Sequence, residues 1–237
     1  MMVGKGIEDI DVVMPKDAYN VGKDMPTFNA YLTVIVRDSE GRIIRVHRQR
    51  SHSPTLNFLK VMLPISYFIG TGNKNSITNT GNTTCTFPCA CVPTSSNSCA
   101  YVSYPNGANN YPTYIAMIQV GSGSQSNPAS AITLAAPIAN GSGSGQLLYG
   151  AVSVSSNIIT SGSSAYFTIS QTYNNNSGGT ITITEVGIVT YIQFVSWNAN
   201  GSYNCGNTLM WYDVLSSPIS VPNGGSVTIY YTFMVNP

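Results

Sequence analysis

The chain has 237 residues, of which 43% are hydrophobic and only 8% are charged. An ordinary soluble domain has about a quarter of its residues charged, so the surface of this chain must be built mainly from neutral polar side chains. The plentiful Val, Ile, Tyr and Phe argue against disorder, the net charge of +1 excludes capture of nucleic acid by the chain as a whole, and no apolar run reaches the roughly 20 residues of a membrane span.

Residues 1–26 are rich in charge, contain two prolines and show no sustained hydrophobic period. We expect them to form an extended arm that becomes ordered only against a neighbouring subunit. Acidic residues occupy the place where a secretory signal would have its apolar segment, so no signal peptide is predicted.

From Phe28 onward, apolar and polar residues alternate, which predicts a half-buried strand. A turn at 38–41 leads to a partner strand at 43–50. Together with the strands below, this pattern predicts an all-β fold: one antiparallel β-sandwich domain of jelly-roll type with about eight strands, spanning residues 27–237. The remaining strands are expected at 113–120, 146–155, 165–174, 180–193, 207–215 and 226–235.

One short helix is expected near 54–63. Ser53 is placed to cap its first turn, and Pro54 occupies a position where its missing N–H costs nothing. Pro64 should end the helix. The face that should pack on the sheet consists of apolar residues at helical spacing, namely Leu56, Leu59 and Leu63.

Residues 71–112 are rich in Asn, Thr, Ser, Pro and Cys, and they predict a long loop inserted in the sandwich. Two disulfides within this loop explain its clustered cysteines better than zinc does, because a C-x-C spacing fits zinc poorly and no histidine accompanies it. Free thiols are the third alternative. The sequence cannot choose among the pairings, and Cys205 either joins one of the four, stays free or bridges subunits. The disulfide candidates are Cys85, Cys89, Cys91 and Cys99.

Charge is segregated along the chain. All ten Lys and Arg and seven of the nine acids lie within residues 1–74, whereas residues 75–237 contain only Glu185 and Asp213. Either the composition drifts, or the two regions face different environments. Under the second interpretation, the charged region contacts partners or the interior of an assembly. The neutral region then faces solvent and tolerates acid, because it has almost nothing to titrate.

The single basic cluster lies on the strand predicted at 43–50 and beside its turn. These charges either prevent pairing at a solvated sheet edge or contact an acidic partner or packaged nucleic acid. The strand lacks the aromatic residues on which single-stranded bases stack, which argues against nucleic acid. The candidate contact residues are Arg37, Arg42, Arg45, Arg48 and Arg50.

No nucleophile-elbow or phosphate-loop motif is present, and His47 and His52 have no third metal ligand nearby. We therefore expect no catalytic residues, no metal and no cofactor. Glu185 and Asp213 are the one pair that invites a glycosidase hypothesis, but lone carboxylates in a neutral region more often accept backbone hydrogen bonds. Glu185 should point inward unless a bulge near Gly187 turns it out.

Four asparagines stand in Asn-x-Ser/Thr sequons, all of them in the neutral region. The region is so rich in Asn, Ser and Thr that chance alone could produce four. The pattern therefore agrees with an external surface without establishing one. These candidate glycosylation sites are Asn82, Asn140, Asn175 and Asn200.

Three groups of segments share a strand-and-turn pattern: Tyr31–Gly41 with Ser51–Leu59, Ile118–Ser124 with Leu134–Ile138, and Ile183–Ile188 with Asp213–Ile219 and Pro222–Thr228. The pattern covers about 28–235. It resembles single jelly-roll virion proteins of viruses that infect hyperthermophilic archaea, the spindle-shaped and turreted icosahedral groups among them, and it is similar to some phage structural proteins. The cysteine-rich insert at 82–99 is not part of it.

The resemblance implies a structural virion protein with no catalytic residues. We expect a vertex (turret), portal-adaptor or tail component that acts by homo-oligomeric assembly, contacts other virion proteins, has a host surface glycan as a further candidate partner, and is exposed outside the host cell. One alternative is an extracellular filament subunit that exchanges a strand with its neighbour. The other is a carbohydrate-binding β-sandwich, in which some of the 15 tyrosines would stack on sugars.

Overall fold

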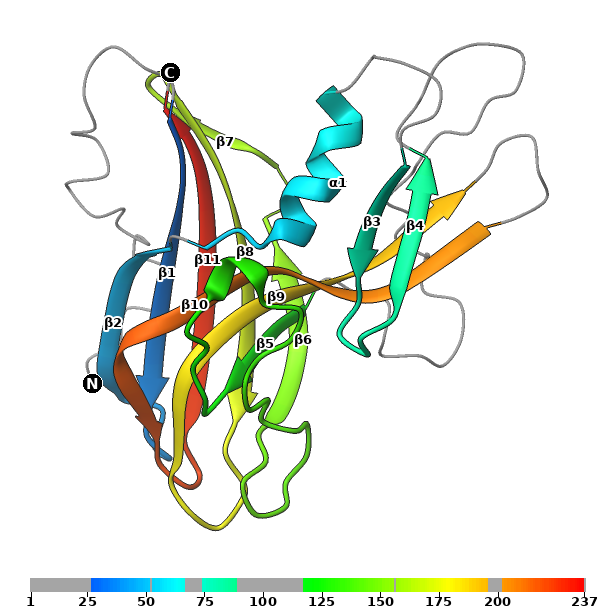
Figure 1. The fold of residues 1–237 in the computed structure, drawn as a ribbon. Coiled ribbons are helices and arrows are strands. Elements are labelled where there is room, and N and C mark those ends of the chain that lie inside the picture. The colour runs from blue at the N-terminus through cyan, green and yellow to red at the C-terminus, as the bar shows by residue number, and fades with distance from the viewer. Residues whose placement is uncertain are drawn as a thin grey trace.

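The computed structural model describes residues 27–51, 53–66, 74–88, 117–155, 157–195 and 202–236. This part of the chain contains eleven strands, a single α-helix, α1 (Leu56–Ser66), and a short 3-10 helix, η3 (Pro128–Ser130). The arm predicted at 1–26 lies outside the described residues. The strands form two antiparallel sheets and a separate hairpin (Figure 1), which confirms the predicted all-β sandwich.

The larger sheet has the strand order β2-β1-β11-β8-β6, and β7 pairs with the N-terminal end of β8. The smaller sheet has the order β10-β9-β5, and β3 pairs with β4 to form the hairpin. The bounds of the larger sheet are β1 Thr27–Arg37, β2 Ile43–Ser51, β6 Leu148–Val154, β7 Ile159–Ser161, β8 Ser164–Asn174 and β11 Ser226–Asn236; those of the rest are β5 Met117–Gly121, β9 Ile181–Val195, β10 Ser202–Val221, β3 Lys74–Thr78 and β4 Thr84–Pro88.

The main core lies between the two sheets. Alternation along β1 directs Ala30, Leu32, Val34 and Val36 inward, as the sequence predicts, and these four residues belong to one large buried cluster. The smaller sheet contributes the opposing apolar side chains, among them Ile118, Ile183, Ile188, Trp211 and Ile219.

A second, smaller core lies beside the sandwich. The C-terminal end of β9 and the N-terminal end of β10 extend past the larger sheet, and the β3–β4 hairpin and α1 lie close to this extension (Figure 1). Val61, Ile77, Ile192 and Cys205 are buried together there. The two cores share β9 and β10, so the long hairpin joins them.

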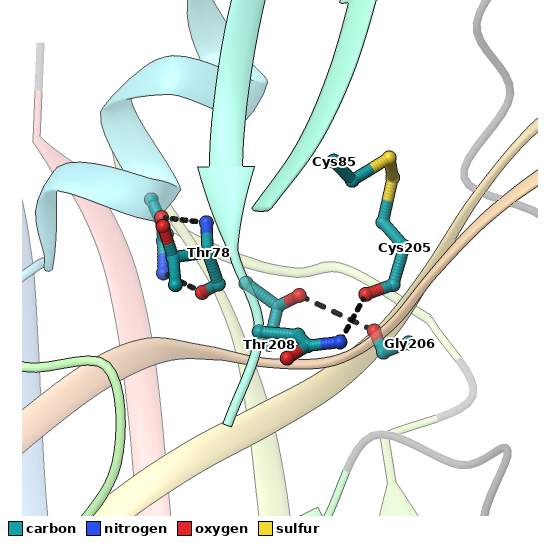
Figure 2. Close-up of a disulfide and its surroundings, with 7 residues drawn as sticks. Thr78, Cys85, Cys205, Gly206 and Thr208 are labelled. Carbon is teal, nitrogen blue, oxygen red and sulfur yellow. Dashed lines mark hydrogen bonds between the residues drawn. A yellow bond between two sulfur atoms is a disulfide. The ribbon is translucent and has the colours of Figure 1, made fainter. Parts of the chain in front are cut away.

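A disulfide between Cys85 and Cys205 ties the β3–β4 hairpin to β10, with the two Cα atoms 5.2 Å apart (Figure 2). The Cys205 carbonyl also accepts a 3.0 Å hydrogen bond from Asn79 Nδ2 in the hairpin turn. Of the three states considered for Cys205, the disulfide to one of the four clustered cysteines is the one found, and the expectation of two disulfides within the cluster is wrong because Cys85 pairs outside it. Cys89, Cys91 and Cys99 lie outside the described residues.

The stretch predicted as a loop at 71–112 contains β3 and β4, so the loop prediction is wrong for residues 74–88. The turn between these strands is organised by Asn79, whose Oδ1 accepts hydrogen bonds from the N–H groups of Gly81 and Thr83 at 3.0 and 2.9 Å. Short Asn- and Thr-rich strands carry too little alternation to be recognised in a sequence. The three-residue β7 was missed for the same reason.

Helix α1 begins and ends later than predicted. Pro54 forms a β-bridge with Trp211, and Thr55 caps the helix in place of Ser53, since its Oγ1 accepts from Phe58 N at 3.4 Å. The helix includes Pro64 and runs to Ser66. Pro64 cannot donate to the Lys60 carbonyl, and the helix ends two residues after it, at Ser66, instead of at the proline.

The predicted packing face of α1 is wrong for Leu56 and Leu59, and the side chain of Leu63 lies outside the part that the structure describes. Leu56 and Leu59 are about half exposed, whereas Asn57 is buried and Phe58 packs against the main core. Asn57 is buried because its side chain pairs with the Thr78 backbone, donating to the carbonyl at 2.8 Å and accepting from the N–H at 3.2 Å. The helix therefore docks through a polar contact to β3 that hydrophobic spacing does not reveal.

The disulfide can be tested by cyanogen bromide cleavage, which separates the chain after methionine. Fragment 118–210 contains Cys205 as its one cysteine, and fragment 63–117 contains Cys85. The two fragments should migrate together without reductant and separate with it. Cys85→Ala combined with Cys205→Ala should lower the free energy of unfolding by up to about 4 kcal/mol, because the cross-link closes a separation of 120 residues. Cys99→Ala, as the control, should keep the fragments linked; a link that persists in the single Cys85→Ala variant would contradict the pairing.

Candidate functional site

Glu185, on β9, is fully buried and accepts four hydrogen bonds. Its Oε1 accepts from Ala136 N at 2.7 Å and Gly123 N at 3.2 Å, and its Oε2 accepts from Ala135 N at 2.9 Å and the Tyr212 hydroxyl at 2.7 Å. Three of the donors belong to the connection between β5 and β6. The carboxylate therefore fixes this connection over the smaller sheet, which is the structural role expected for a lone carboxylate.

A bulge decides the direction of Glu185. On β9, Ile183 faces the main core and so does Val186, so the alternation changes phase between them. The register against β10 also jumps here, from Ile219 opposite Ile183 to Val214 opposite Glu185. Of the two directions considered from the sequence, the outward one is correct: the Glu185 side chain points away from the main core and is buried under the β5–β6 connection.

Glycines allow the connection to approach this closely. A Cβ atom on Gly187 would lie 2.9 Å from the Leu134 Cδ1 and 2.9 Å from the Trp211 carbonyl, and one on Gly123 would lie 2.7 Å from the Ala135 Cβ. Any side chain at these positions would force neighbours apart. Three segments that carry the sequence resemblance, 118–124, 134–138 and 183–188, thus meet in one packed unit around the Glu185 carboxylate.

Asp213 lies in a separate buried network on the inner face of the smaller sheet. Its Oδ2 accepts hydrogen bonds from the Tyr231 hydroxyl at 2.9 Å and from the Ser51 hydroxyl, which in turn accepts from Trp211 Nε1. Burial, together with the Asp213 carboxylate, raises the pKa of Tyr231 well above its usual value. The network joins β2, β10 and β11 across the core.

The two carboxylates point to opposite faces of the smaller sheet. Glu185 bonds Tyr212, which packs under the β5–β6 connection, and Asp213 bonds Tyr231 in the main core. They cannot flank one glycosidic bond, so the structure does not support the glycosidase pair. Because both are buried, and because the sequence holds no other charged residue after Lys74, the surface formed by residues 75–237 carries no charged side chain.

The structure divides the predicted basic cluster. Arg42 pairs with Asp38 and Glu40 at the turn, at 2.8 and 3.0 Å, and its hydrogen bond to Asp38 lowers the pKa of that carboxyl. Arg45 points inward and donates to Ser217 Oγ on β10 at 2.6 Å. Arg37 is half-buried, and the exposed arginines of β2 are Arg48 and Arg50, of which Arg50 donates to Asn29 Oδ1.

The sequons differ in accessibility. Asn82 is exposed in the β3–β4 turn, and Asn140 is exposed with its Oδ1 accepting from Tyr149 N at 2.9 Å. Asn175 is fully buried, and its Nδ2 donates to the carbonyls of Gly179 and Val221 at 2.8 Å each, so this amide cannot carry a glycan in the folded protein. Asn200 lies outside the described residues.

His47 is half-buried with its Nε2 2.9 Å from Gln49 Oε1, and His52 lies outside the described residues. Within the described ranges no three His, Cys, Asp or Glu side chains gather as a metal site would require. No described helix is both long and apolar enough to cross a membrane.

A groove of about 310 Å³ opens on the outer face of the larger sheet, over β6, β7, β8 and β11. Sequence reasoning missed this site. The feature of the sequence that could have predicted the groove is an alternation along these strands, in which hydroxyl residues occupy the outward positions and apolar residues occupy the inward ones. The lining residues are Ser153, Ser155, Ile159, Tyr166, Thr168, Ser170, Tyr230 and Thr232.

Comparison with known proteins gives no relative: no protein-family profile, no curated protein and no solved structure matches the chain.

We expect Glu185→Gln to destabilise the fold by about 1.5–3 kcal/mol. The amide nitrogen would face an N–H or hydroxyl donor that the carboxylate now satisfies, while the volume stays almost the same. Chemical denaturation measures the loss. Glu40→Gln, an exposed change of the same chemistry, is the matched control and should have little effect. Equal stability of the two variants would refute the structural role of Glu185.

Alkaline pH should weaken the fold. Burial raises the pKa of Tyr149 to about 12, and it also raises the pKa of Tyr173, Tyr212 and Tyr231 above the usual value. An unfolded tyrosine ionises near pH 10, so the stabilising contribution of these groups is complete below about pH 10 and is lost as the pH rises through their folded values. Tyrosinate absorbance should therefore rise in two steps, the second coinciding with loss of β-sheet circular dichroism. A single step near pH 10 without unfolding would contradict this expectation.

Proposed function

We propose that this protein is a structural subunit of a homo-oligomeric assembly, and that the assembly is a virion, as the sequence resemblance implies. The observation that carries the proposal is the exposed apolar edge of the larger sheet at β2. Among the described residues β2 pairs with β1 alone, and Ile43, Ile44 and Val46 are 39%, 52% and 45% exposed. An unpaired strand edge with apolar side chains offers both backbone hydrogen bonds and burial to another strand.

Contacts from the smaller sheet hold β2 rigidly in place. Gln49 Nε2 donates to the Val214 carbonyl at 3.0 Å, and Gln49 Oε1 accepts from Ser216 N at 2.9 Å. With Arg45 bonded to Ser217, the inward side of β2 is attached to β10 along its length. A rigid strand loses little entropy when a partner binds to its edge, which favours association.

A second copy of the chain fits this edge. Antiparallel pairing centred on Val46 sets two Val46 residues side by side and places each Arg48 opposite Ile44, so the two copies of Arg48 do not face each other. The symmetry axis is then a two-fold perpendicular to the sheet, the commonest symmetry of homo-oligomers. The proposed contact also explains why β2 carries arginines whereas residues 75–237 carry no Lys or Arg: β2 is covered in the assembly, and residues 75–237 are exposed.

The uncharged surface supports an external location. Residues 75–237 expose no side-chain carboxylate or amine, so acid neither breaks surface ion pairs there nor builds repulsion between positive charges. Such a surface suits a particle that meets acidic surroundings.

Ile44→Lys combined with Val46→Lys should convert the assembly to monomers, because two buried positions would each gain a charge. Light scattering coupled to size-exclusion chromatography, with negative-stain microscopy, measures the change. Ile158→Lys, which alters a 69% exposed residue between β6 and β7, is the control and should assemble normally. A wild-type chain that stays monomeric at high concentration would refute the assembly, and antibodies against the chain that fail to label intact virus particles would refute the virion location.

A further inference from the structure

We propose that the groove over β6, β7, β8 and β11 is a binding site for a neutral saccharide. This inference stands apart from the proposed assembly, because the groove and the β2 edge lie at opposite sides of the larger sheet. Its volume of about 310 Å³ is at the lower end of small-ligand pockets and suits one or two sugar rings.

The chemistry of the lining matches a sugar. Seven of the eight lining residues carry a hydroxyl group, and none carries a charge. Hydroxyl groups donate and accept hydrogen bonds, as the hydroxyl groups of a sugar do. A phosphate, sulfate or carboxylate ligand would need a cationic or concentrated N–H donor set, which these side chains do not provide.

Pairing across the strands sets the hydroxyls in ordered rows. Thr168 lies opposite Thr232 with their Oγ1 atoms 3.1 Å apart, and Ser170 lies between Tyr230 on one side and Ser153 on the other. The row of Ser153, Ser170 and Tyr230 has no side-chain hydrogen bond to another described residue. These three hydroxyls are therefore available to a ligand.

Two aromatic rings complete the site. Tyr166 and Tyr230 are half-buried and contribute to the lining from β8 and β11, and Ile159 of β7 lies opposite Tyr166. Aromatic faces attract the C–H groups on the apolar face of a pyranose, while the phenolic hydroxyl remains free to hydrogen-bond. Aromatic faces beside a row of neutral hydroxyls favour a sugar over a peptide or a nucleotide.

The rim of the groove is fixed to its floor. Ser155 N donates to the Thr168 carbonyl at 2.9 Å, and Thr168 N donates to Ser155 Oγ at 3.1 Å. These two hydrogen bonds link the end of β6 to the middle of β8, so this side of the groove is already in place before a ligand binds. The site is shallow, so we expect a dissociation constant on the order of 1 mM per site, which several sites in one assembly would strengthen through avidity.

The test uses the full chain and ligand-observed saturation-transfer NMR. The neutral probes are glucose, galactose, mannose, N-acetylglucosamine and lactose, and the charged probes are glucose 6-phosphate and N-acetylneuraminic acid. At least one neutral probe should bind and the charged probes should not. Tyr230→Ala should weaken that binding about fivefold or more through loss of the ring, whereas Tyr230→Phe should retain most of it.

Ser170→Ala removes one available hydroxyl without adding atoms to the groove and should weaken binding about threefold or more. Ser220→Ala, at an exposed position on β10 in the smaller sheet, is the matched control and should bind as the wild type does. Ser170→Trp should fill the groove and abolish binding, and it provides a second reading if Tyr230→Ala does not fold. Circular dichroism checks the fold of each variant.

Three results would overturn the inference: no neutral probe binds, binding persists unchanged in the folded Ser170→Trp variant, or a synthetic peptide of residues 1–26 occupies the groove in preference to every sugar. The last result would assign the groove to the arm of this chain or of a second copy. None of the three changes the expectation for the β2 edge, so the two proposals can fail separately.

Discussion

The buried carboxylate of Glu185 is the interaction on which the smaller sheet depends. That sheet has three strands, and its outer face presents apolar side chains such as Val189, Leu209 and Tyr212. The β5–β6 connection covers them with Ala131 and Leu134. The connection has few side chains of its own to hold it, so three backbone N–H groups bonded to one carboxylate replace the side-chain packing that a helix would supply.

Burying the two carboxylates of the neutral region has a consequence for the surface. Each is surrounded by donors that compensate for the loss of water, as a buried charge requires. Because both carboxylates are buried, every polar side chain that residues 75–237 expose to solvent is neutral. Solubility then rests on hydroxyls and amides, and the same chemistry makes the outer face of the larger sheet suitable for neutral ligands.

The larger sheet offers two surfaces of different character. At one side, β2 presents apolar side chains on an edge that no other described strand pairs with; at the other, β8 and β11 support a groove with hydroxyl groups. A two-fold axis perpendicular to the sheet would leave both copies of the groove open toward the same side. Assembly through one surface is therefore compatible with, and would multiply, binding at the other.

The sequence by itself determined the elements whose pattern is local. Alternation along β1 and β11 reports which side chains face the core, and turn residues report where most of the long strands end, so the all-β sandwich follows from the residues alone. Four other features depend on contacts between distant segments. Glu185 turns outward because of a bulge, Cys85 bonds Cys205 across 120 residues, Asn175 is buried under Val221, and Leu56 and Leu59 stay exposed because Asn57 of the same helix binds β3. Each is decided by which distant group lies opposite, and periodicity along one strand or helix contains no information about that partner.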